Sequence, residues 1–546
     1  MAKILLDEIE ESSRFIDAQI CVIGAGIGGL LFARRLAQGG RKVVVVESGI
    51  EGFDDEIHRL NEIEDPATRY TRALTGRYRG LGGSSTRWGG RMIPISAHES
   101  SARPYISQSR WPLQLGELEA YHHEIESLFG TGHDSYEHIS GDRPDVAMFP
   151  AFDTTLTPRW AKCPTFKQCN IATVLADDLR NLPGVEIWLG ATVCDFELDR
   201  AAGCLSAITA RSLGGKTLTV RANDFVIAAG TIETTRLLLL LDRISEGHAF
   251  RRCRVLGRYF QDHLKAEVAT IGRGDPSATN RLFGYRFVNS VRRDLHLELS
   301  KSAQHDDAVA SAFAYVAMDI AESPLADIKR LAQGLQRGRV DPGDIWRVSR
   351  NLGLVSRAAW WRIMRNQLYI PASVDLRLLV CVEQLPHRAN RISLAEKRDR
   401  FGMPKALFEW GPTETEEQTF QSCVARIGAY WTQAGFDRIC PLTWLVARGE
   451  GAAQIIDRAE ACAHPSGSTR MGTVVEDSVV DPDLWCHEVP NVAALSASVF
   501  PTAGSANPTF TIMKLALWLG DSYLRRLSSQ VAGVVAKRPS MRTVPI

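Results

Sequence analysis

The feature that most constrains the fold is a strand–turn–helix–strand pattern in the first fifty residues. The apolar runs at 19–23 and 42–47 are typical of buried parallel strands, and residues 30–37 between them have helical spacing. Gly24, Gly26 and Gly29 give the joining turn the spacing Gly-x-Gly-x-x-Gly. In this pattern the first glycine makes a tight turn, the second lets backbone approach a pyrophosphate, and the third lets helix pack on strand. The segment predicts a Rossmann-like dinucleotide-binding unit.

The second strand of this unit ends in an acid, Glu47. A carboxylate at this position can hold the hydroxyls of an adenosine ribose, and it disfavours a 2′-phosphate because like charges would meet. Gly28 lies in the same turn and completes the predicted pyrophosphate cradle. A tight turn without a ligand would leave Glu47 unexplained, so we favour NAD or FAD binding.

Charge and cysteine usage exclude several classes of protein. The 546 residues carry 64 basic and 63 acidic side chains, so no global field attracts nucleic acid. The eleven cysteines include no C-x-x-C pair, which favours free thiols in a reducing compartment, although Cys163 and Cys169 flank a loop and could pair. We expect no metal site.

The sequence shows neither a signal peptide nor a membrane-spanning segment. Residues 1–17 are acidic and lack the apolar core of a signal peptide. No stretch of about 20 apolar residues could span a bilayer. We therefore expect a cytoplasmic protein without a transmembrane segment.

The chain is too long for one compact core, and its patterns predict an α/β fold of two interleaved domains. Buried strands at 19–23, 42–47 and 224–229 predict one parallel sheet assembled from distant segments. Alternating strands at 374–382 and 406–410 predict an α+β domain on an antiparallel sheet. The expected segments are 15–100, 171–265 and 456–530 for the nucleotide domain, 101–170 for a cap and connection, and 266–455 for the substrate domain.

Within the substrate domain, residues 323–369 form a basic, tryptophan-rich insertion. The pattern predicts two helices broken at Asp341-Pro342-Gly343. The pattern leaves several interpretations open. The simplest is a pair of helices that pack their aromatic residues inward behind a solvated basic face. The others are a lid over the site, a partner-docking face and a membrane-surface element. The basic residues are Lys329, Arg330, Arg337, Arg339, Arg347, Arg350, Arg357, Arg362 and Arg365.

Two further glycine-containing segments add candidate binding residues. The loop at 78–95 is dense in small residues, which let a backbone lie against a flat or charged group. A mobile linker would be polar and would not contain a tryptophan. Gly230 ends the buried strand at 224–229 and precedes a helix. The candidates in the loop are Gly82, Gly83, Ser84, Arg87 and Trp88.

The C-terminal region offers a base and its partner. His464 can accept a hydroxyl proton in its neutral form, and Asn507 can hold the same oxygen by hydrogen bonding. Pro508 suits the first position of a helix at 508–524, whose N-terminus carries partial positive charge. A lone histidine is usually structural, so His464 is a candidate base only because Asn507 and the predicted helix N-terminus accompany it.

These segments together resemble the glucose–methanol–choline (GMC) oxidoreductase family, flavoproteins that oxidise alcohols by hydride transfer to FAD. The resemblance covers the glycine turn with Glu47, the loop at 80–90, residues 226–241, the His-Pro-x-Gly segment at His464 and the Asn-Pro-Thr helix at Asn507. The Ser-Thr-Arg-Trp and Asn-Pro-Thr-Phe-Thr-Ile-Met stretches look most like the pyranose-oxidase-like bacterial branch.

The resemblance implies roles for individual residues. His464 and Asn507 take the catalytic positions, Val193 takes the backbone contact to adenine, and Pro508 and Thr509 lie at the flavin pyrimidine. Ser496, followed by Ala497, stands where the family usually has an aspartate near the ribityl or pyrophosphate chain. Arg87 replaces the histidine through which pyranose oxidases attach FAD, so FAD should bind non-covalently.

The predicted function is FAD-dependent oxidation of a primary or secondary alcohol of a sugar, glycoside or polyol to the carbonyl. The alternatives are a flavoenzyme that tailors a secondary metabolite by desaturation or another non-sugar oxidation, and a flavin-bearing docking protein. Oxygen, a quinone or a redox protein remains open as the electron acceptor.

Overall fold

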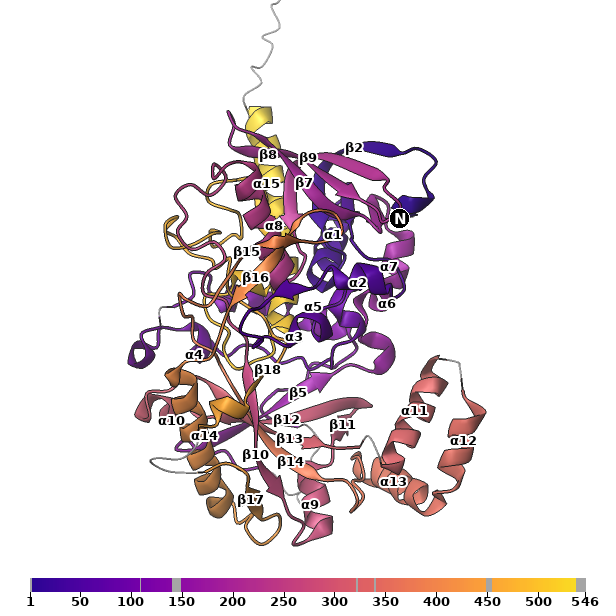
Figure 1. Cartoon of the computed structure of the whole chain (residues 1–546). Helices are drawn as coiled ribbons and strands as arrows, with labels where there is room; N and C mark the ends of the chain where they lie inside the picture. The colour runs from indigo at the N-terminus through magenta and orange to yellow at the C-terminus, as the bar shows by residue number, and fades with distance from the viewer. Residues whose placement is uncertain are drawn as a thin grey trace, which may run out of the picture.

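A computed structural model describes residues 2–108, 110–139, 149–320, 323–337, 340–447 and 454–536, apart from the side chains of 2, 336–337 and 530–536. Two large sheets lie one above the other, and a group of three helices projects to one side of the lower one (Figure 1). Within this part of the chain, no helix is long and apolar enough to cross a membrane. All eleven cysteines are free, so the pairing considered for Cys163 and Cys169 is wrong.

The first sheet has eight strands in the order β1-β6-β3-β2-β9-β8-β7, with β19 paired to β9. Its centre is parallel, whereas β7 and β8 pair antiparallel. All four residues of β3 are valines and all are buried, which is typical of a strand covered on both faces. The strands are β1 (Ala2–Leu5), β2 (Ser13–Ile23), β3 (Val43–Val46), β6 (Val185–Leu189), β7 (Thr192–Asp199), β8 (Cys204–Arg211), β9 (Thr217–Ile227) and β19 (Val492–Ala494).

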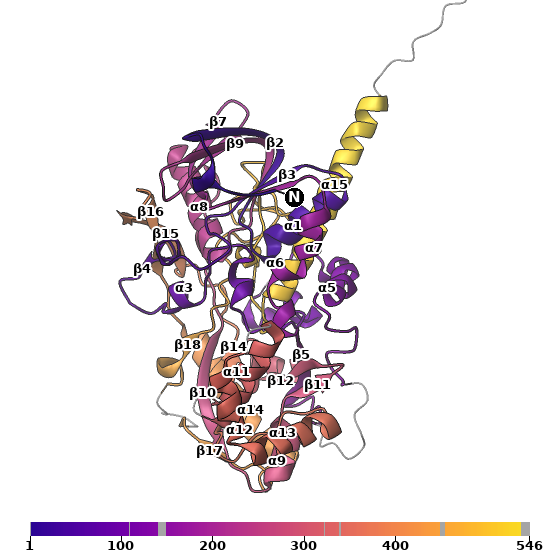
Figure 2. The same cartoon turned by 90° about the vertical axis from the view of Figure 1, so that its right-hand side faces the viewer.

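Three helices that begin beside this sheet matter for the site: α1 (Ile27–Gln38), α8 (Thr231–Ile244) and α15 (Thr509–Ala536). The packing of α1 against α15 brings the two ends of the sequence together, and α15 extends beyond the sheet (Figure 2). Phe32 of α1 meets Tyr523 of α15 edge to face, with ring centroids 6.4 Å apart.

The second sheet is mostly antiparallel and has the order β11-β12-β13-β14-β10-β17, with β18 on β10 and β5 on β12. Strand β5 comes from 101–170, which the sequence predicted to be only a cap and connection. Strands β15, β16 and β4 form a separate, small sheet. The strands are β4 (Ile63–Glu64), β5 (Leu156–Cys163), β10 (Leu264–Ile271), β11 (Arg286–Val288), β12 (Val291–Leu299), β13 (Ala312–Met318), β14 (Leu376–Val382), β15 (Arg391–Arg398), β16 (Pro404–Glu409), β17 (Leu442–Trp444) and β18 (Glu460–Ala461).

The basic insertion contains three helices, α11 (Pro324–Arg337), α12 (Pro342–Ser349) and α13 (Leu352–Arg365), rather than the two expected. The expected break at Asp341 is present because its side chain caps α12. Trp346 and Trp360 are 61% and 50% exposed, so these rings do not pack inward as the simplest interpretation required. Arg339 and the side chain of Arg337 lie outside the described residues.

The remaining helices are short, except for α14, which covers the second sheet. They are α2 (Asp55–Arg59), α3 (Arg72–Thr75), α4 (Ala97–Ser100), α5 (His122–Leu128), α6 (Ile171–Val174), α7 (Ala176–Asn181), α9 (Pro276–Phe283), α10 (Lys301–Asp306) and α14 (Glu414–Gln433).

Candidate active site

The three glycines of the N-terminal turn have different surroundings. Gly24 has a φ of +109°, and a Cβ there would lie 2.6 Å from the carbonyl oxygen of Ala228. A Cβ on Gly29 would lie 2.0 Å from the carbonyl oxygen of Gly24, so only glycine lets helix α1 approach the strand. A Cβ on Gly26 would meet no atom within 4 Å, because this glycine faces a cavity. Gly24 is therefore needed for the turn, Gly29 for the close packing of helix on strand, and Gly26 for the open space beside the cavity.

Glu47 ties the turn to two other segments. Its buried carboxylate accepts hydrogen bonds from the backbone N–H groups of Ala25 at 2.7 Å, Gly49 at 2.8 Å and Gly80 at 3.0 Å. Burial raises the pKa of this carboxyl, and the three N–H donors and Arg79 oppose that rise. The acid therefore fixes the glycine-rich loop at 80–90 against the end of β3 and lines the same cavity.

This first cavity encloses about 1350 Å³, including space open to solvent, and the N-termini of three helices meet there. Ile27 of α1, Thr231 of α8 and Thr509 of α15 all line it. Neither α1 nor α15 has an acid in its first turn, and α1 begins without a side-chain cap. Free N–H groups and aligned peptide dipoles make such ends suitable for anions.

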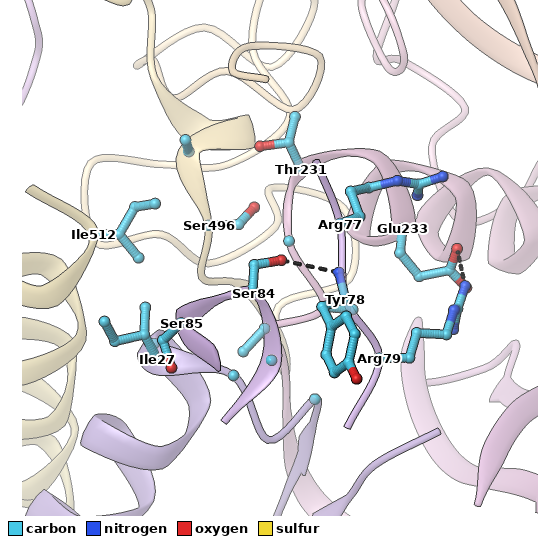
Figure 3. A pocket seen from close by; sticks show the side chains of 18 of the residues that line it. Ile27, Arg77, Tyr78, Arg79, Ser84, Ser85, Thr231, Glu233, Ser496 and Ile512 are labelled. Atoms are coloured by element: carbon cyan, nitrogen blue, oxygen red, sulfur yellow. Dashed lines mark hydrogen bonds and ion pairs between the residues drawn. The ribbon is translucent and has the colours of Figure 1, made fainter. Parts of the chain in front are cut away.

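Figure 3 shows a strip of basic and aromatic side chains, Arg77, Tyr78 and Arg79, on one side of the cavity, with Ser496 and Ile512 on the other. Ser84 lies between them and its hydroxyl accepts from the Tyr78 N–H at 3.1 Å. Arg79 forms a buried ion pair with Glu233 at 3.0 Å. This pair and Arg236 lower the pKa of Glu233 to about 2 despite its burial.

A second cavity of about 1710 Å³, also partly open to solvent, adjoins the first. His464, Thr509 and Trp88 line both, so the two form one continuous cleft. Asn507 lines only the second cavity, directly before the helix end that faces the first. His464 thus stands at the junction of the cavities.

A chain of hydrogen bonds sets the proton positions on His464. His263 Nε2 lies 2.7 Å from the carbonyl oxygen of Gly504, which can only accept, so this nitrogen carries the hydrogen. In a neutral ring His263 Nδ1 is then an acceptor, and it lies 2.9 Å from His464 Nδ1. The hydrogen of His464 is consequently on Nδ1, which leaves a lone pair on Nε2, 3.1 Å from Asn507 Nδ2.

Backbone contacts hold this histidine in place. The His464 N–H donates to Asp262 Oδ1 at 2.8 Å, and Tyr70 donates its hydroxyl to Asp262 Oδ2 at 2.8 Å. Burial raises the pKa of Asp262 to about 7. Ala463, the preceding residue, has a φ of 60°, an unusual conformation for a residue other than glycine.

The environment keeps His464 neutral. Burial is the largest influence that lowers its pKa well below the usual value, followed by His263, Arg91 and Lys265. The lone pair on Nε2 is therefore present near neutral pH. The nearby Asn507 Oδ1 is buried and has no hydrogen-bond partner among the described residues, so the amide retains an unused acceptor beside the histidine.

Most of the residues that the sequence singled out converge on this cleft. Four of them do not line the first cavity: Gly29, Gly82, Arg87 and Asn507. Gly29 and Gly82 instead pack against neighbouring parts of the chain. Arg87 is exposed, lines the second cavity and lies over the Tyr78 ring at 4.8 Å. The residues that do line the first cavity are Gly24, Gly26, Gly28, Glu47, Gly83, Ser84, Trp88, Val193, Gly230, His464, Ser496, Ala497, Pro508 and Thr509.

Sequence reasoning missed His263, Asp262 and Arg77. The first two stand in the run Gln261–Lys265, where an acid, an imidazole and an ammonium group precede an alternating strand. That density of ionisable groups was the available signal. Arg77 gave none, because a single arginine before a glycine-rich loop has many structural uses.

The observations fit the FAD that the sequence resemblance implied. Glu47 and Val193 border the part of the cavity next to β3 and β7, where an adenosine would lie. The uncapped N-terminus of α1 suits a pyrophosphate. The N-terminus of α15 lies beside His464, where the reactive flavin ring of FAD would have to lie. The open space beside Gly26 is what an approaching pyrophosphate needs.

Two family profiles match the chain. The profile described as GMC oxidoreductase covers residues 386–516, and the one described as NAD(P)-binding Rossmann-like domain covers residues 22–51. The first includes His464 and Asn507, and the second includes the glycine turn and Glu47.

Similar proteins match over nearly the whole chain. The 2-methyl-1,2-propanediol dehydrogenase of Mycolicibacterium austroafricanum is 25% identical, with 94% of this chain and 96% of that protein aligned. The 6'''-hydroxyparomomycin C oxidase of Streptomyces lividus is 23% identical, with 94% and 93% aligned. The solved structure of pyridoxine 4-oxidase from Mesorbium loti has the same fold, with a TM-score of 0.55 at 17% identity over 93% of this chain and 99% of that one.

Proposed function

Since the chain belongs to the GMC oxidoreductase family of FAD-dependent enzymes that act on alcohol groups, we propose that it oxidises an alcohol of a sugar, glycoside or polyol to the carbonyl. The observation that carries this proposal is the position of His464, at the junction of the two cavities with an unprotonated Nε2. An alcohol in the second cavity would lie between this base and the cofactor site.

The protein's own groups prepare the alcohol for oxidation. The substrate hydroxyl donates to His464 Nε2 and accepts from Asn507 Nδ2, in place of their direct contact of 3.1 Å. As the proton moves to Nε2, the imidazolium keeps its Nδ1–H bond to His263. When bound, FAD supplies the hydride acceptor for the carbon that bears this hydroxyl.

The test is anaerobic flavin reduction in the purified protein with a panel of sugars, glycosides, polyols and simple alcohols. We expect His464→Ala to keep bound FAD but to lose roughly 10²–10⁴ in reduction rate, the usual contribution of a general base. His305→Ala is the matched control, since His305 is an exposed histidine of α10. Unchanged kinetics in His464→Ala would remove this residue from the role, and a flavin that no alcohol reduces would favour the tailoring alternative.

FAD attachment is proposed to be non-covalent. His464 is the only histidine or cysteine among the described residues that line the first cavity, and its Nε2 already serves as the base. Arg87, in the loop position used for attachment in pyranose oxidases, cannot form such a link. Acid precipitation should release FAD into the supernatant, whereas a yellow pellet would contradict this proposal.

We also propose an electron acceptor (oxygen, a quinone or a redox protein), a cytoplasmic location and an interleaved division into domains. Air readmitted after anaerobic reduction separates an oxidase from a dehydrogenase that uses a quinone or a redox protein. Eleven free thiols support a reducing, cytoplasmic location. The interleaved division into 15–100, 171–265 and 456–530 against 266–455 is supported by most strands of the two large sheets, except that β1 precedes residue 15 and β18 joins the second sheet.

A further inference from the structure

The second cavity has a one-sided charge. Its lining includes the cations Arg77, Arg87, Arg91 and Lys265, and among the described lining residues there is neither an aspartate nor a glutamate. Apolar rings supply much of the remaining surface, including Phe313. Since charged groups in a cleft are usually balanced by neighbours, the acids behind this lining decide how much positive charge reaches the cavity.

Only one of the four cations has a close carboxylate partner behind the wall. Arg91 Nε lies 2.7 Å from Asp294 Oδ2. Arg77 instead donates to the carbonyl oxygens of Ala73, at 2.8 Å, and Asn61. Burial lowers the pKa of Arg77 to about 10, which still leaves it charged at neutral pH.

Lys265 is the cation best placed for a ligand. It lies on β10, and its ammonium has no hydrogen-bond or ion-pair partner within the described ranges. Its neighbour across β18 is Glu460, but that carboxylate pairs with Arg72 at 2.5 Å. Lys265 and His464 line the same cavity, and Lys265 contributes to the low pKa of His464, after burial, His263 and Arg91.

We propose that the substrate is an anionic alcohol, in which a carboxylate or phosphate group meets Lys265 while the hydroxyl reaches His464. This inference rests on the proposed alcohol oxidation and narrows its substrate class to sugar acids, sugar phosphates or similar hydroxy anions. A cationic amino sugar would meet only like charge in this cavity. A neutral polyol would leave the Lys265 ammonium without a counter-ion.

The test uses anaerobic flavin reduction with substrates matched except for charge: glucose, glucuronate and glucose 6-phosphate, and glycerol, glycerate and glycerol 3-phosphate. We expect an anionic member to have the higher kcat/KM, and its KM to rise with salt because ions screen the attraction. The anion that is preferred identifies carboxylate or phosphate as the recognised group. Equal or better reduction by the neutral members overturns the anionic assignment and leaves alcohol oxidation standing, whereas reduction by none of a broad alcohol panel overturns both.

Lys265→Gln links the preference to one residue. A hydrogen bond to a charged group is worth enough to lower the ratio of kcat/KM for the anionic over the neutral alcohol by roughly 10- to 100-fold. Lys397→Gln removes the same charge from an exposed lysine paired with Glu64 on the small sheet, and should leave the ratio unchanged. An unaltered ratio in Lys265→Gln, with a normal flavin spectrum, would refute the role of this lysine.

A second, independent cluster lies outside the cleft, at α5. His123 Nδ1, Glu126 Oε2 and His133 Nδ1 are mutually 3.0–3.3 Å apart. Tetrahedral zinc with nitrogen and oxygen ligands at 2.0–2.1 Å has ligand-to-ligand edges of about 3.3 Å. The two Nδ1 atoms, 3.1 Å apart, cannot both carry a hydrogen directed at the other, so at least one presents a lone pair.

The surroundings hold the acid in an orientation suited to a metal. Glu126 Oε1 accepts from Lys162 Nζ at 2.6 Å and from the Tyr136 hydroxyl at 3.0 Å, which leaves Oε2 for the histidines. We infer that this triad binds a divalent cation such as Zn²⁺, although the sequence predicted no metal. The metal would clip the loop that carries His133 to helix α5.

Zinc binding to the FAD-loaded protein tests this site without any activity measurement. Equilibrium dialysis against ZnCl₂ should give one tightly held Zn²⁺ per chain in the parent protein, and thermal unfolding should move to higher temperature. His133→Ala should lose both effects, and His305→Ala, an exposed histidine elsewhere, should keep them. Equal zinc uptake by the parent and His133→Ala would overturn the site.

Discussion

His263 offers the sharpest test of how the site prepares its base. Its Nε2–H is committed to the Gly504 carbonyl at 2.7 Å, so its Nδ1 lone pair holds the hydrogen of His464 on Nδ1. His263→Leu removes that acceptor while keeping an apolar side chain in the space. The hydrogen of His464 is then free to move to Nε2, which would occupy the lone pair needed for the substrate.

The size of the effect follows from one buried hydrogen bond. A buried donor left without a partner costs about 1–3 kcal/mol, which corresponds to a fall of roughly 5- to 150-fold in the population of the correct tautomer. We therefore expect flavin reduction in His263→Leu to slow by about that factor. In His263→Asn the side-chain oxygen can accept from His464 Nδ1, so part of the rate should return.

The pH profile separates this effect from a general loss of packing. His464 acts as a base, so the rate falls as pH drops through its pKa, and a low pKa keeps the enzyme active at low pH. A charged His263 would lower this pKa by repulsion, but the neutral His263 deduced above accepts a hydrogen bond from the His464 imidazolium and stabilises it. Its replacement by leucine should therefore lower the pKa of His464 and move the acid limb of the profile to lower pH.

The assay is stopped-flow flavin reduction over a pH series in the parent, His263→Leu and His263→Asn proteins. An equal loss of rate in both variants with an unmoved acid limb would refute the tautomer argument and leave His263 as a packing residue. Retained FAD absorbance in each variant confirms that the comparison concerns the base rather than cofactor loss.

Three other predictions concern the cofactor site and stability. Gly26→Ala should purify with little FAD but unfold near the midpoint of the FAD-free parent, because its Cβ would enter the cavity rather than contact protein; full flavin content would contradict this. Gly29→Ala should instead unfold at a clearly lower temperature, since its Cβ would lie 2.0 Å from the Gly24 carbonyl oxygen. Glu233→Gln should cost roughly 3–5 kcal/mol in free energy of unfolding, because it leaves Arg79 without its buried carboxylate partner and Arg236 with Asp399 alone. The pKa of Glu233 is depressed from its usual 4.5 to about 2, so its stabilising contribution is present above pH 4.5 and should be lost as pH falls toward 2, as urea unfolding at several pH values would reveal.

The sequence predicted the family, the α/β class and FAD because these depend on local patterns that survive without tertiary information. Gly24, Gly26 and Gly29 are separated by fixed spacings, and each spacing has a geometric cause. These predictions are confirmed by the family profiles and the solved structures of the same fold. The insertion at 323–369 was only partly predicted, since the second break, at Arg350-Asn351, is marked only by Asn351 and by Gly353 in the first turn of α13, a weaker signal than Asp341-Pro342-Gly343.

The site was harder to predict because several of its parts meet only in three dimensions. His263 and His464 are 201 positions apart, and no periodicity links them. The charge of the second cavity depends on acids outside its lining: Asp294 pairs with the lining residue Arg91, whereas Glu460 pairs with Arg72 and not with Lys265. The spacing of residues within one segment does not predict which side chains from different strands will pair.

The association of α1 with α15 has a consequence for synthesis. The cavity beside Gly26 is closed by Ser496, Thr509 and Ile512, which leave the ribosome more than 450 positions after that glycine. A nascent chain would present the N-terminal turn with one wall missing for most of its translation. Stable FAD retention should therefore begin only when α15 has emerged, so the cofactor is captured at the end of folding and chains stopped before residue 509 should reach the degradation machinery empty.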